Sequence, residues 1–128
     1  SLKRMVLVGY SMGARLGLSV LSSLVDCIDL VILESVHPGL VTQSERDARL
    51  IREQTIQHQL KTSSFDSFLT DWYDQPLFSK TRSHRKFDQF IKSRLNNDID
   101  QLQLSLAYYG LSQQPNYWSL IQNNSQKR

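Results

Sequence analysis

The sequence predicts an α/β fold in which two parallel strands carry an inserted block of helices. Two apolar runs, 5–8 and 30–34, flank a stretch of helix-forming residues, which is the pattern of a strand–helix–strand unit. The chain from 44 to 112 then shows helical apolar spacing and no further strand, as in a cap domain. We expect a core segment over 1–43, a helical cap over 44–112, and a linker with a short helix returning to the core over 113–128.

The pattern Gly-x-Ser-x-Gly lies between the first apolar run and the helix that follows it. It places Ser11 at the tip of a turn, and we expect Gly9 and Gly13 to permit a turn that larger residues would obstruct. A helix is expected over 12–24. Strand, turn and helix in this order form the nucleophile elbow of the α/β-hydrolase fold. The prediction is therefore an α/β-hydrolase fragment with an inserted four-helix cap.

Apolar spacing and capping residues place the other elements. The run 30–34 is almost continuously apolar, so we expect a strand covered on both faces. The four cap helices are expected over 44–61 with Ser44 and Asp47 as a capping pair, from Ser63 or Ser64 to Pro76, over 83–95, and from Asp98 to Gly110. Asn116 is expected to cap a short helix, and the polar tail 122–128 is expected to fray.

Composition and charge exclude some classes of binding partner. The 128 residues carry a net charge of +3, but the basic residues are spread among acidic ones, which argues against a nucleic-acid partner. No apolar run has the length of a membrane span. The chain opens without methionine and runs straight into a strand, so we interpret it as an internal fragment that is inactive and poorly folded alone.

Ser11 is the candidate catalytic residue. A serine hydroxyl is activated by a histidine that an acid orients, and the backbone N–H after the serine, here on Met12, stabilises an oxyanion. In this fold the triad residues follow one another along the chain as serine, acid and histidine. His37 comes too early in that order to be the triad histidine, so we expect it to lie in a turn or in a pocket wall. His58 and His84 are expected to be solvated. The catalytic triad is incomplete in these residues.

Several arginines follow the elbow at helical spacing. Arg15 lies one turn after Ser11, where it either pairs with a surface acid or binds substrate. Three further arginines follow at intervals of three residues: Arg46, Arg49 and Arg52. They form either a solvated basic face or part of a cap helix that overhangs the active site. Arg94 lies at another helix end. Guanidinium groups bind carboxylates at two points, so such a set indicates a substrate with more than one carboxylate.

These segments resemble the 2-succinyl-6-hydroxy-2,4-cyclohexadiene-1-carboxylate synthases, a family within the α/β-hydrolases. The matching segments are 9–15, 34–40, 45–49, 68–78, 93–98 and 114–118. The His-Pro-Gly-Leu turn and the Trp-Tyr-x-x-Pro-x-Phe segment are far more specific than the elbow. The family's triad aspartate and histidine and its N-terminal oxyanion loop have no counterpart here.

The resemblance implies a lyase of menaquinone or phylloquinone biosynthesis. The family eliminates pyruvate from 2-succinyl-5-enolpyruvyl-6-hydroxy-3-cyclohexene-1-carboxylate, without a metal or organic cofactor. It implies that Ser11 is the base and that Met12 supplies the oxyanion N–H. Arg15, Arg49 and Arg94 would bind substrate carboxylates, while Tyr10 and Trp72 would line the pocket; the sequence alone leaves Trp72 between that role and the cap core.

The resemblance further implies a small polycarboxylate as partner, a cytoplasmic or plastid location, and possible fusion to other enzymes of the quinone pathway. The alternative is a serine esterase or carbon–carbon bond hydrolase with the same elbow. Its acyl pocket would favour apolar residues where the arginines stand. A second alternative is a non-catalytic binding module of this fold.

Overall fold

The computed structural model describes residues 5–125. The chain forms two compact units. The first comprises Ser1–Asp47 and Leu111–Arg128, and the second Ala48–Gly110.

The first unit is built on a pair of parallel strands. β1 (Met5–Tyr10) and β2 (Ile28–Glu34) pair with Gly9 opposite Leu33 and Tyr10 opposite Glu34. Between them the chain forms α1 (Met12–Leu24) and the short 3₁₀ helix η1 (Val25–Cys27). The predicted strand–helix–strand unit is present.

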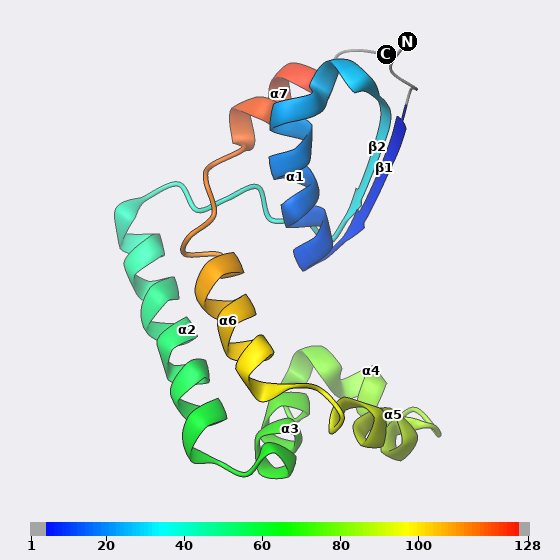
Figure 1. Cartoon of the computed structure of the whole chain (residues 1–128), viewed down its shortest axis with the longest axis vertical. Coiled ribbons are helices and arrows are strands. Elements are labelled where there is room, and N and C mark those ends of the chain that lie inside the picture. The colour runs from blue at the N-terminus through cyan, green and yellow to red at the C-terminus, as the bar shows by residue number, and fades with distance from the viewer. Residues whose placement is uncertain (1–4, 126–128) are drawn as a thin grey trace. The chain divides into compact units, whose positions relative to one another are not determined.

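Helix α1 packs on one face of the strand pair (Figure 1). Ala14 and Leu18 are fully buried on this helix. Gly17 allows the close approach, because a Cβ there would lie 3.2 Å from the Leu33 side chain. The last helix, α7 (Trp118–Ser125), also belongs to this unit.

The other face of the strand pair is exposed within the described chain. Side chains alternate along a strand, so every second residue points away from α1. The large apolar residues on this face are each half exposed or more: Val6, Val8, Tyr10, Leu30 and Ile32. The expectation that the second strand is covered on both faces is therefore wrong for the residues described, because α1 covers only one side.

Helix α2 (Gln43–Thr62) begins one residue before the predicted start. Thr42 and Glu45 form its capping box, not Ser44 and Asp47. Thr42 Oγ1 accepts from the Glu45 N–H at 3.2 Å, and Glu45 Oε2 accepts from the Thr42 N–H at 2.8 Å. Both patterns have the same spacing, and the box that forms is the one whose acid reaches back to the N-terminal N–H groups.

The second unit contains most of α2 and the remaining cap helices. They are α3 (Phe65–Tyr73), η2 (Pro76–Phe78), α4 (Ser79–Arg82), α5 (Phe87–Arg94) and α6 (Ile99–Tyr109). Ser64 and Asp98 cap α3 and α6 as predicted. The core is a cluster of Leu60, Phe68 and Leu69, with Trp72 and other apolar residues packed against it.

Further helix bounds differ from prediction. The helix expected over 83–95 is shorter and is preceded by a separate short helix, α4. Between α4 and α5 the Phe87 N–H donates to the carbonyl of His84, three residues back, so the α-helical hydrogen-bond pattern is interrupted. The tail expected to fray is helical through Ser125 in α7; residues 126–128 lie outside the described part.

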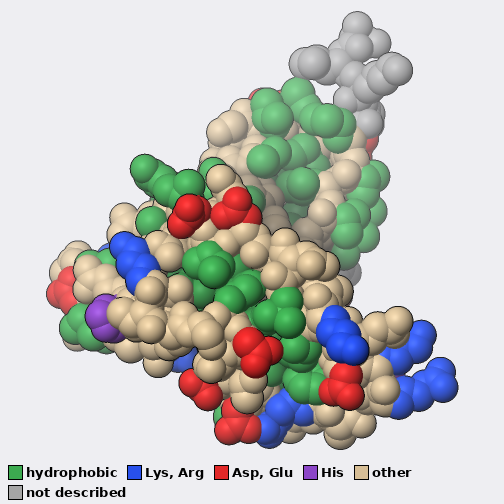
Figure 2. Space-filling model, turned by 60° about the horizontal axis from the view of Figure 1, so that its bottom comes forward, with side chains coloured by type: hydrophobic (Ala, Val, Ile, Leu, Met, Phe, Trp, Pro, Cys, Tyr) green, Lys and Arg blue, Asp and Glu red, His purple; other side chains and the backbone are tan. Residues whose placement is uncertain are grey.

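Acidic and basic side chains both lie on the face drawn in Figure 2, with hydrophobic side chains exposed between them. No helix in the described part of the chain has both the length and the apolar character needed to cross a bilayer. The mixed surface charge agrees with the spread of basic residues noted in the sequence.

Candidate active site

Ser11 lies at the sharp turn between β1 and α1. Its backbone has φ 49° and ψ −116°, a conformation that costs a non-glycine residue energy and that clusters at functional sites. The Ser11 N–H donates to the carbonyl of Glu34 at the end of β2, 2.9 Å away, which ties the turn to the sheet. The Ser11 side chain makes no capping hydrogen bond to α1 and is exposed. Its hydroxyl is therefore accessible at a strained turn, as the elbow pattern predicts.

The two glycines of the elbow are not equivalent. A Cβ on Gly9 would lie 2.7 Å from the Ala14 Cα and 2.9 Å from its nitrogen, which are backbone atoms that cannot move aside. A Cβ on Gly13 would meet no atom within 4 Å among the described residues. We expected that a side chain at either glycine would collide with neighbouring atoms, and this is correct for Gly9 only. The reason is that Gly9 faces the first turn of α1, whereas Gly13 faces outward.

Tyr10 and Met12 flank the serine. Met12 is the first residue of α1, where a backbone N–H has no acceptor within the helix. The first helical bond runs from the Arg15 N–H to the Ser11 carbonyl at 3.1 Å. The Met12 N–H is thus placed at a helix N-terminus, where developing negative charge is stabilised. Tyr10 ends β1 with an exposed side chain on the face away from α1.

Arg15 is held by a residue from the far end of the chain. Its Nη1 donates to Oε1 of Gln114 at 3.1 Å. Gln114 is buried, and its own Nε2 donates to the His37 carbonyl at 2.7 Å. One amide therefore links the helix after Ser11 to the turn after β2. Gln114 lies in the stretch 113–128 that was expected to begin as a linker, and no role was predicted for it. Its position within the matching segment 114–118 is the signal that could have indicated one.

The turn after β2 is fixed by the segment that follows the cap. Gly39 has φ 120°, and a Cβ there would lie 2.5 Å from the Pro115 carbonyl oxygen. The Gly39 carbonyl accepts from the Trp118 indole N–H at 3.1 Å, and the Pro38 carbonyl accepts from the Tyr117 N–H at 2.6 Å. These contacts bring together two of the matching segments, 34–40 and 114–118. His37 lies in this turn, where its Nδ1 accepts the Gly39 N–H at 3.2 Å.

The three arginines of α2 do not act as one row. Arg46 donates to the carbonyls of Leu40 and Gln114, both at 2.9 Å, and to that of Ser112 at 3.4 Å. Its guanidinium satisfies backbone groups, which is a structural role. Arg49 instead pairs with Glu53 through a 2.7 Å hydrogen bond from Nε. Arg52 lines a cavity in the second unit.

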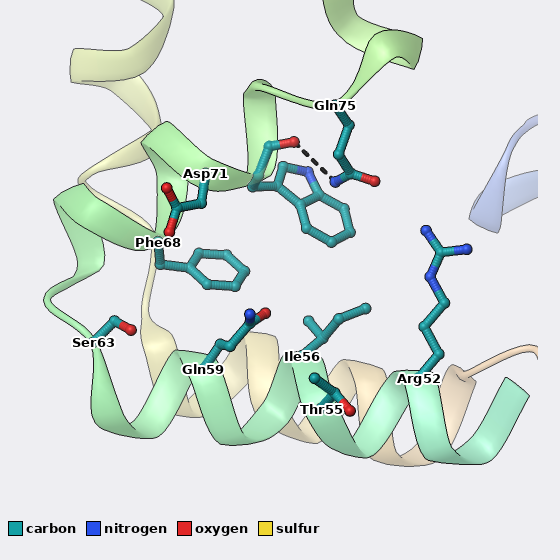
Figure 3. Close-up of a pocket in the computed structure, with 9 residues that line it drawn as sticks. Arg52, Thr55, Ile56, Gln59, Ser63, Phe68, Asp71 and Gln75 are labelled. Carbon is teal, nitrogen blue, oxygen red and sulfur yellow. Dashed lines mark hydrogen bonds between the residues drawn. The ribbon is translucent and has the colours of Figure 1, made fainter.

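That cavity lies between α2 and α3 and has a volume of about 330 Å³. Arg52, Ile56 and Gln59 project from α2 toward Phe68, Asp71 and Gln75 (Figure 3). Trp72 also lines it, while its ring lies 5.9 Å from the Phe68 ring within the aromatic core. Trp72 thus belongs to the cap core and also lines this cavity; its place in a substrate pocket stays a prediction.

Arg94 is the last residue of α5 and is exposed. Its Cζ lies 4.7 Å from the centre of the Phe90 ring, a cation–π contact that leaves the edge of the guanidinium accessible. Arg49, Trp72 and Arg94 each have different neighbours within the second unit. The structure therefore groups Tyr10, Ser11, Met12 and Arg15 in the first unit and holds the other three predicted residues at separate places in the second.

Comparison with known proteins shows what this chain is similar to. No protein-family model matches the chain. A 2-succinyl-6-hydroxy-2,4-cyclohexadiene-1-carboxylate synthase from Photorhabdus laumondii is 32% identical over 111 residues, which are 85% of this chain and 39% of that relative. The solved structure of MenH from S. aureus matches with a TM-score of 0.84 and 28% identity, over 94% of this chain and 46% of that one. The resemblance to the synthase family is confirmed.

The α/β-hydrolase fold predicted for this chain is likewise confirmed. The chain spans less than half the length of the synthases it matches. It also matches the chloroplastic protein PHYLLO of Arabidopsis thaliana at 26% identity, over 94% of this chain and 7% of that protein. In that relative the matched segment is part of a far longer chain.

Proposed function

We propose that the protein containing this chain is a lyase that eliminates pyruvate from 2-succinyl-5-enolpyruvyl-6-hydroxy-3-cyclohexene-1-carboxylate. The observation that carries the proposal is the strained Ser11 at the start of α1, followed one turn later by an arginine held in place by a buried amide. The confirmed resemblance to the synthases supplies the substrate.

In the proposed reaction Ser11 acts as a base and forms no acyl-enzyme. Its hydroxyl passes its proton to a histidine, which an acid orients, and the serine oxygen removes a proton from the substrate ring; the histidine and the acid would come from parts of the protein outside this chain. The electron pair left on carbon forms the new ring double bond, and the carbon–oxygen bond to the enolpyruvyl group breaks. Pyruvate leaves as its enolate and is then protonated. The Met12 N–H would stabilise the oxyanion that develops.

The substrate carries three carboxylates, on the ring, the succinyl chain and the enolpyruvyl group. Arg15, Arg49 and Arg94 are proposed to bind them, because planar guanidinium groups suit two-point carboxylate binding. Tyr10 and Trp72 are proposed to line the substrate pocket. An esterase acting on uncharged acyl groups would gain nothing from these charges, so they favour the lyase over the hydrolase alternative.

The decisive experiment follows pyruvate release from the enolpyruvyl substrate with coupled lactate dehydrogenase, in the full-length protein. Ser11→Ala should lower kcat by about a thousandfold or more, since the base is lost. Ser19→Ala is the matched control, because Ser19 is exposed on the same helix. A full-length protein that releases no pyruvate yet cleaves simple esters through Ser11 is a hydrolase, and the proposal is then wrong.

The cellular setting is proposed on the same basis. We infer a cytoplasmic location, or a plastid one in a photosynthetic eukaryote. The chain matches only 7% of PHYLLO, which favours a longer protein that contains further enzymes of the pathway. Fractionation of the source cells, followed by immunoblotting for chain length, tests both points. A short protein found in another compartment would contradict them.

A further inference from the structure

Glu53 is a buried carboxylate in the cap. It lies one helical turn after Arg49 on α2 and is 3% exposed. Its Oε1 accepts a 2.7 Å hydrogen bond from the Nε of Arg49. A carboxylate removed from water is costly unless charged or polar partners compensate it, so this position demands an explanation.

The end of α6 packs over the same carboxylate. Gly110 follows α6, and a Cβ there would collide with Oε2 of Glu53 and would lie 2.7 Å from the Leu106 carbonyl oxygen. Only glycine leaves room for the Glu53 side chain in this place. Glu53 is therefore confined by its surroundings as well as by its hydrogen bond, and it offers Arg49 a fixed acceptor.

The hydrogen bond uses the inner nitrogen of the Arg49 guanidinium. Within the described residues no hydrogen bond is made by Nη1 or Nη2, and the Arg49 side chain is 35% exposed. The guanidinium is planar, so fixing Nε also fixes the direction of the two terminal nitrogens. Those nitrogens together form the end of the fork that binds a carboxylate at two points.

We propose that Glu53 is a positioning residue that orients Arg49 for binding a carboxylate of the substrate. This inference rests on the proposed function. Glu53 does not touch the ligand; it restricts the Arg49 side chain before binding, so less conformational entropy is lost when the carboxylate binds. The negative charge of Glu53 weakens the attraction of Arg49 for an anion, and the fixed geometry offsets that loss.

The test measures KM and kcat for pyruvate release in Glu53→Gln, Arg49→Gln and the double variant of the full-length protein. Glu53→Gln should raise KM about tenfold while kcat stays within about twofold, because substrate binding is lost rather than chemistry. In the Arg49→Gln background the same change should raise KM no further, since Glu53 acts through Arg49. If the KM of the double variant instead rises by the product of the two single factors, Glu53 acts independently of Arg49 and the proposal is wrong.

Asp74→Asn is the matched control. Asp74 forms an ion pair with Arg82 at an exposed position in the same unit, so this change also removes the carboxylate partner of an arginine. Its KM should equal that of the wild type. A variant that only loses folded protein lowers the measured maximal rate but leaves KM unchanged, so a purely structural role of Glu53 would appear as a lower rate alone. Gly110→Ala, which displaces Glu53 without changing its charge, should raise KM as Glu53→Gln does.

Equilibrium binding separates this inference from the proposed function. Calorimetry with 2-succinylbenzoate, an aromatic analogue of the proposed product, needs no catalysis. If the wild type releases no pyruvate but binds this probe, a Kd raised about tenfold by Glu53→Gln, and not raised further in the Arg49→Gln background, supports the role of Glu53 while the lyase proposal fails. An unchanged Kd in Glu53→Gln, or no binding by the wild type, overturns it.

Discussion

Arg15 and Gln114 are 99 positions apart in sequence and are joined by a hydrogen bond of 3.1 Å between Nη1 and Oε1. The second function of the Gln114 amide, donation to the His37 carbonyl, makes it the link between the elbow helix and the turn after β2. A residue from beyond the cap thus helps to define the surroundings of the candidate catalytic serine.

Replacement of Gln114 by leucine should destabilise the protein. Leucine can neither accept from Arg15 nor donate to His37, so two hydrogen bonds at a buried position are lost. We expect the free energy of unfolding, measured by urea titration, to fall by about 1–3 kcal/mol. The control is Gln113→Leu at the exposed neighbouring position, which should change it by no more than about 0.5 kcal/mol. Equal effects would contradict the role of the Gln114 amide.

The two elbow glycines should respond oppositely to alanine. Gly9→Ala places a Cβ against the backbone of Ala14 and should lower the free energy of unfolding by about 1–3 kcal/mol. Gly13→Ala places its Cβ in open space on a helix and should leave that free energy unchanged or raise it by up to about 1 kcal/mol. Urea titration of both variants checks the pair, and a larger loss in Gly13→Ala would show that the structure of the turn is wrong.

Arg46 and Arg52 provide a second contrast. Arg46→Lys loses the fork that donates to three carbonyls and should cost about 1–2 kcal/mol of unfolding free energy. Arg52→Lys keeps the charge of an exposed cavity-lining residue and should have almost no effect. Thermal unfolding of the two variants distinguishes them. A similar loss in both would mean that the hydrogen bonds of Arg46 contribute nothing measurable.

The capping box of α2 should titrate at low pH. The backbone N–H of Thr42 holds the pKa of Glu45 below its ordinary value, with smaller contributions from the Thr42 hydroxyl and the Val41 N–H. A depressed pKa means that the unfolded chain binds the proton more readily. This stabilisation is fully present above the ordinary glutamate pKa and is lost as the pH falls through the folded value.

Carboxyl-carbon NMR titration measures that pKa directly. Thr42→Val should raise the pKa of Glu45 toward its ordinary value, because the hydroxyl contribution is removed. Thr55→Val is the control on the same helix: the Thr55 hydroxyl donates to the Ile51 carbonyl and has no contact with Glu45. A Glu45 pKa that Thr42→Val leaves in place would contradict the capping assignment.

The sequence by itself determined the features that depend on neighbouring residues. The caps Ser64 and Asp98 arise from contacts a few positions apart, which local pattern encodes. The elbow around Ser11 and the strand–helix–strand unit were predicted from the contiguous order of apolar runs, turn residues and helix formers, although the two strands pair across the helix. The resemblance to the synthases also came from sequence, because its motifs are contiguous.

The tertiary structure decided which atoms meet across long separations. Sequence spacing placed Arg46, Arg49 and Arg52 in one row, but each has different surroundings. Arg46 donates to the carbonyl of Gln114, far along the chain, Arg49 pairs with Glu53 one turn later, and Arg52 lines a cavity. The unequal roles of Gly9 and Gly13 depend on which one faces α1. The i,i+4 spacing of Arg49 and Glu53 is visible in the sequence, but the burial of Glu53 beneath Gly110 is not, since it requires the end of α6 to return to α2. Local patterns record propensity, whereas burial and partner choice arise only when distant segments pack.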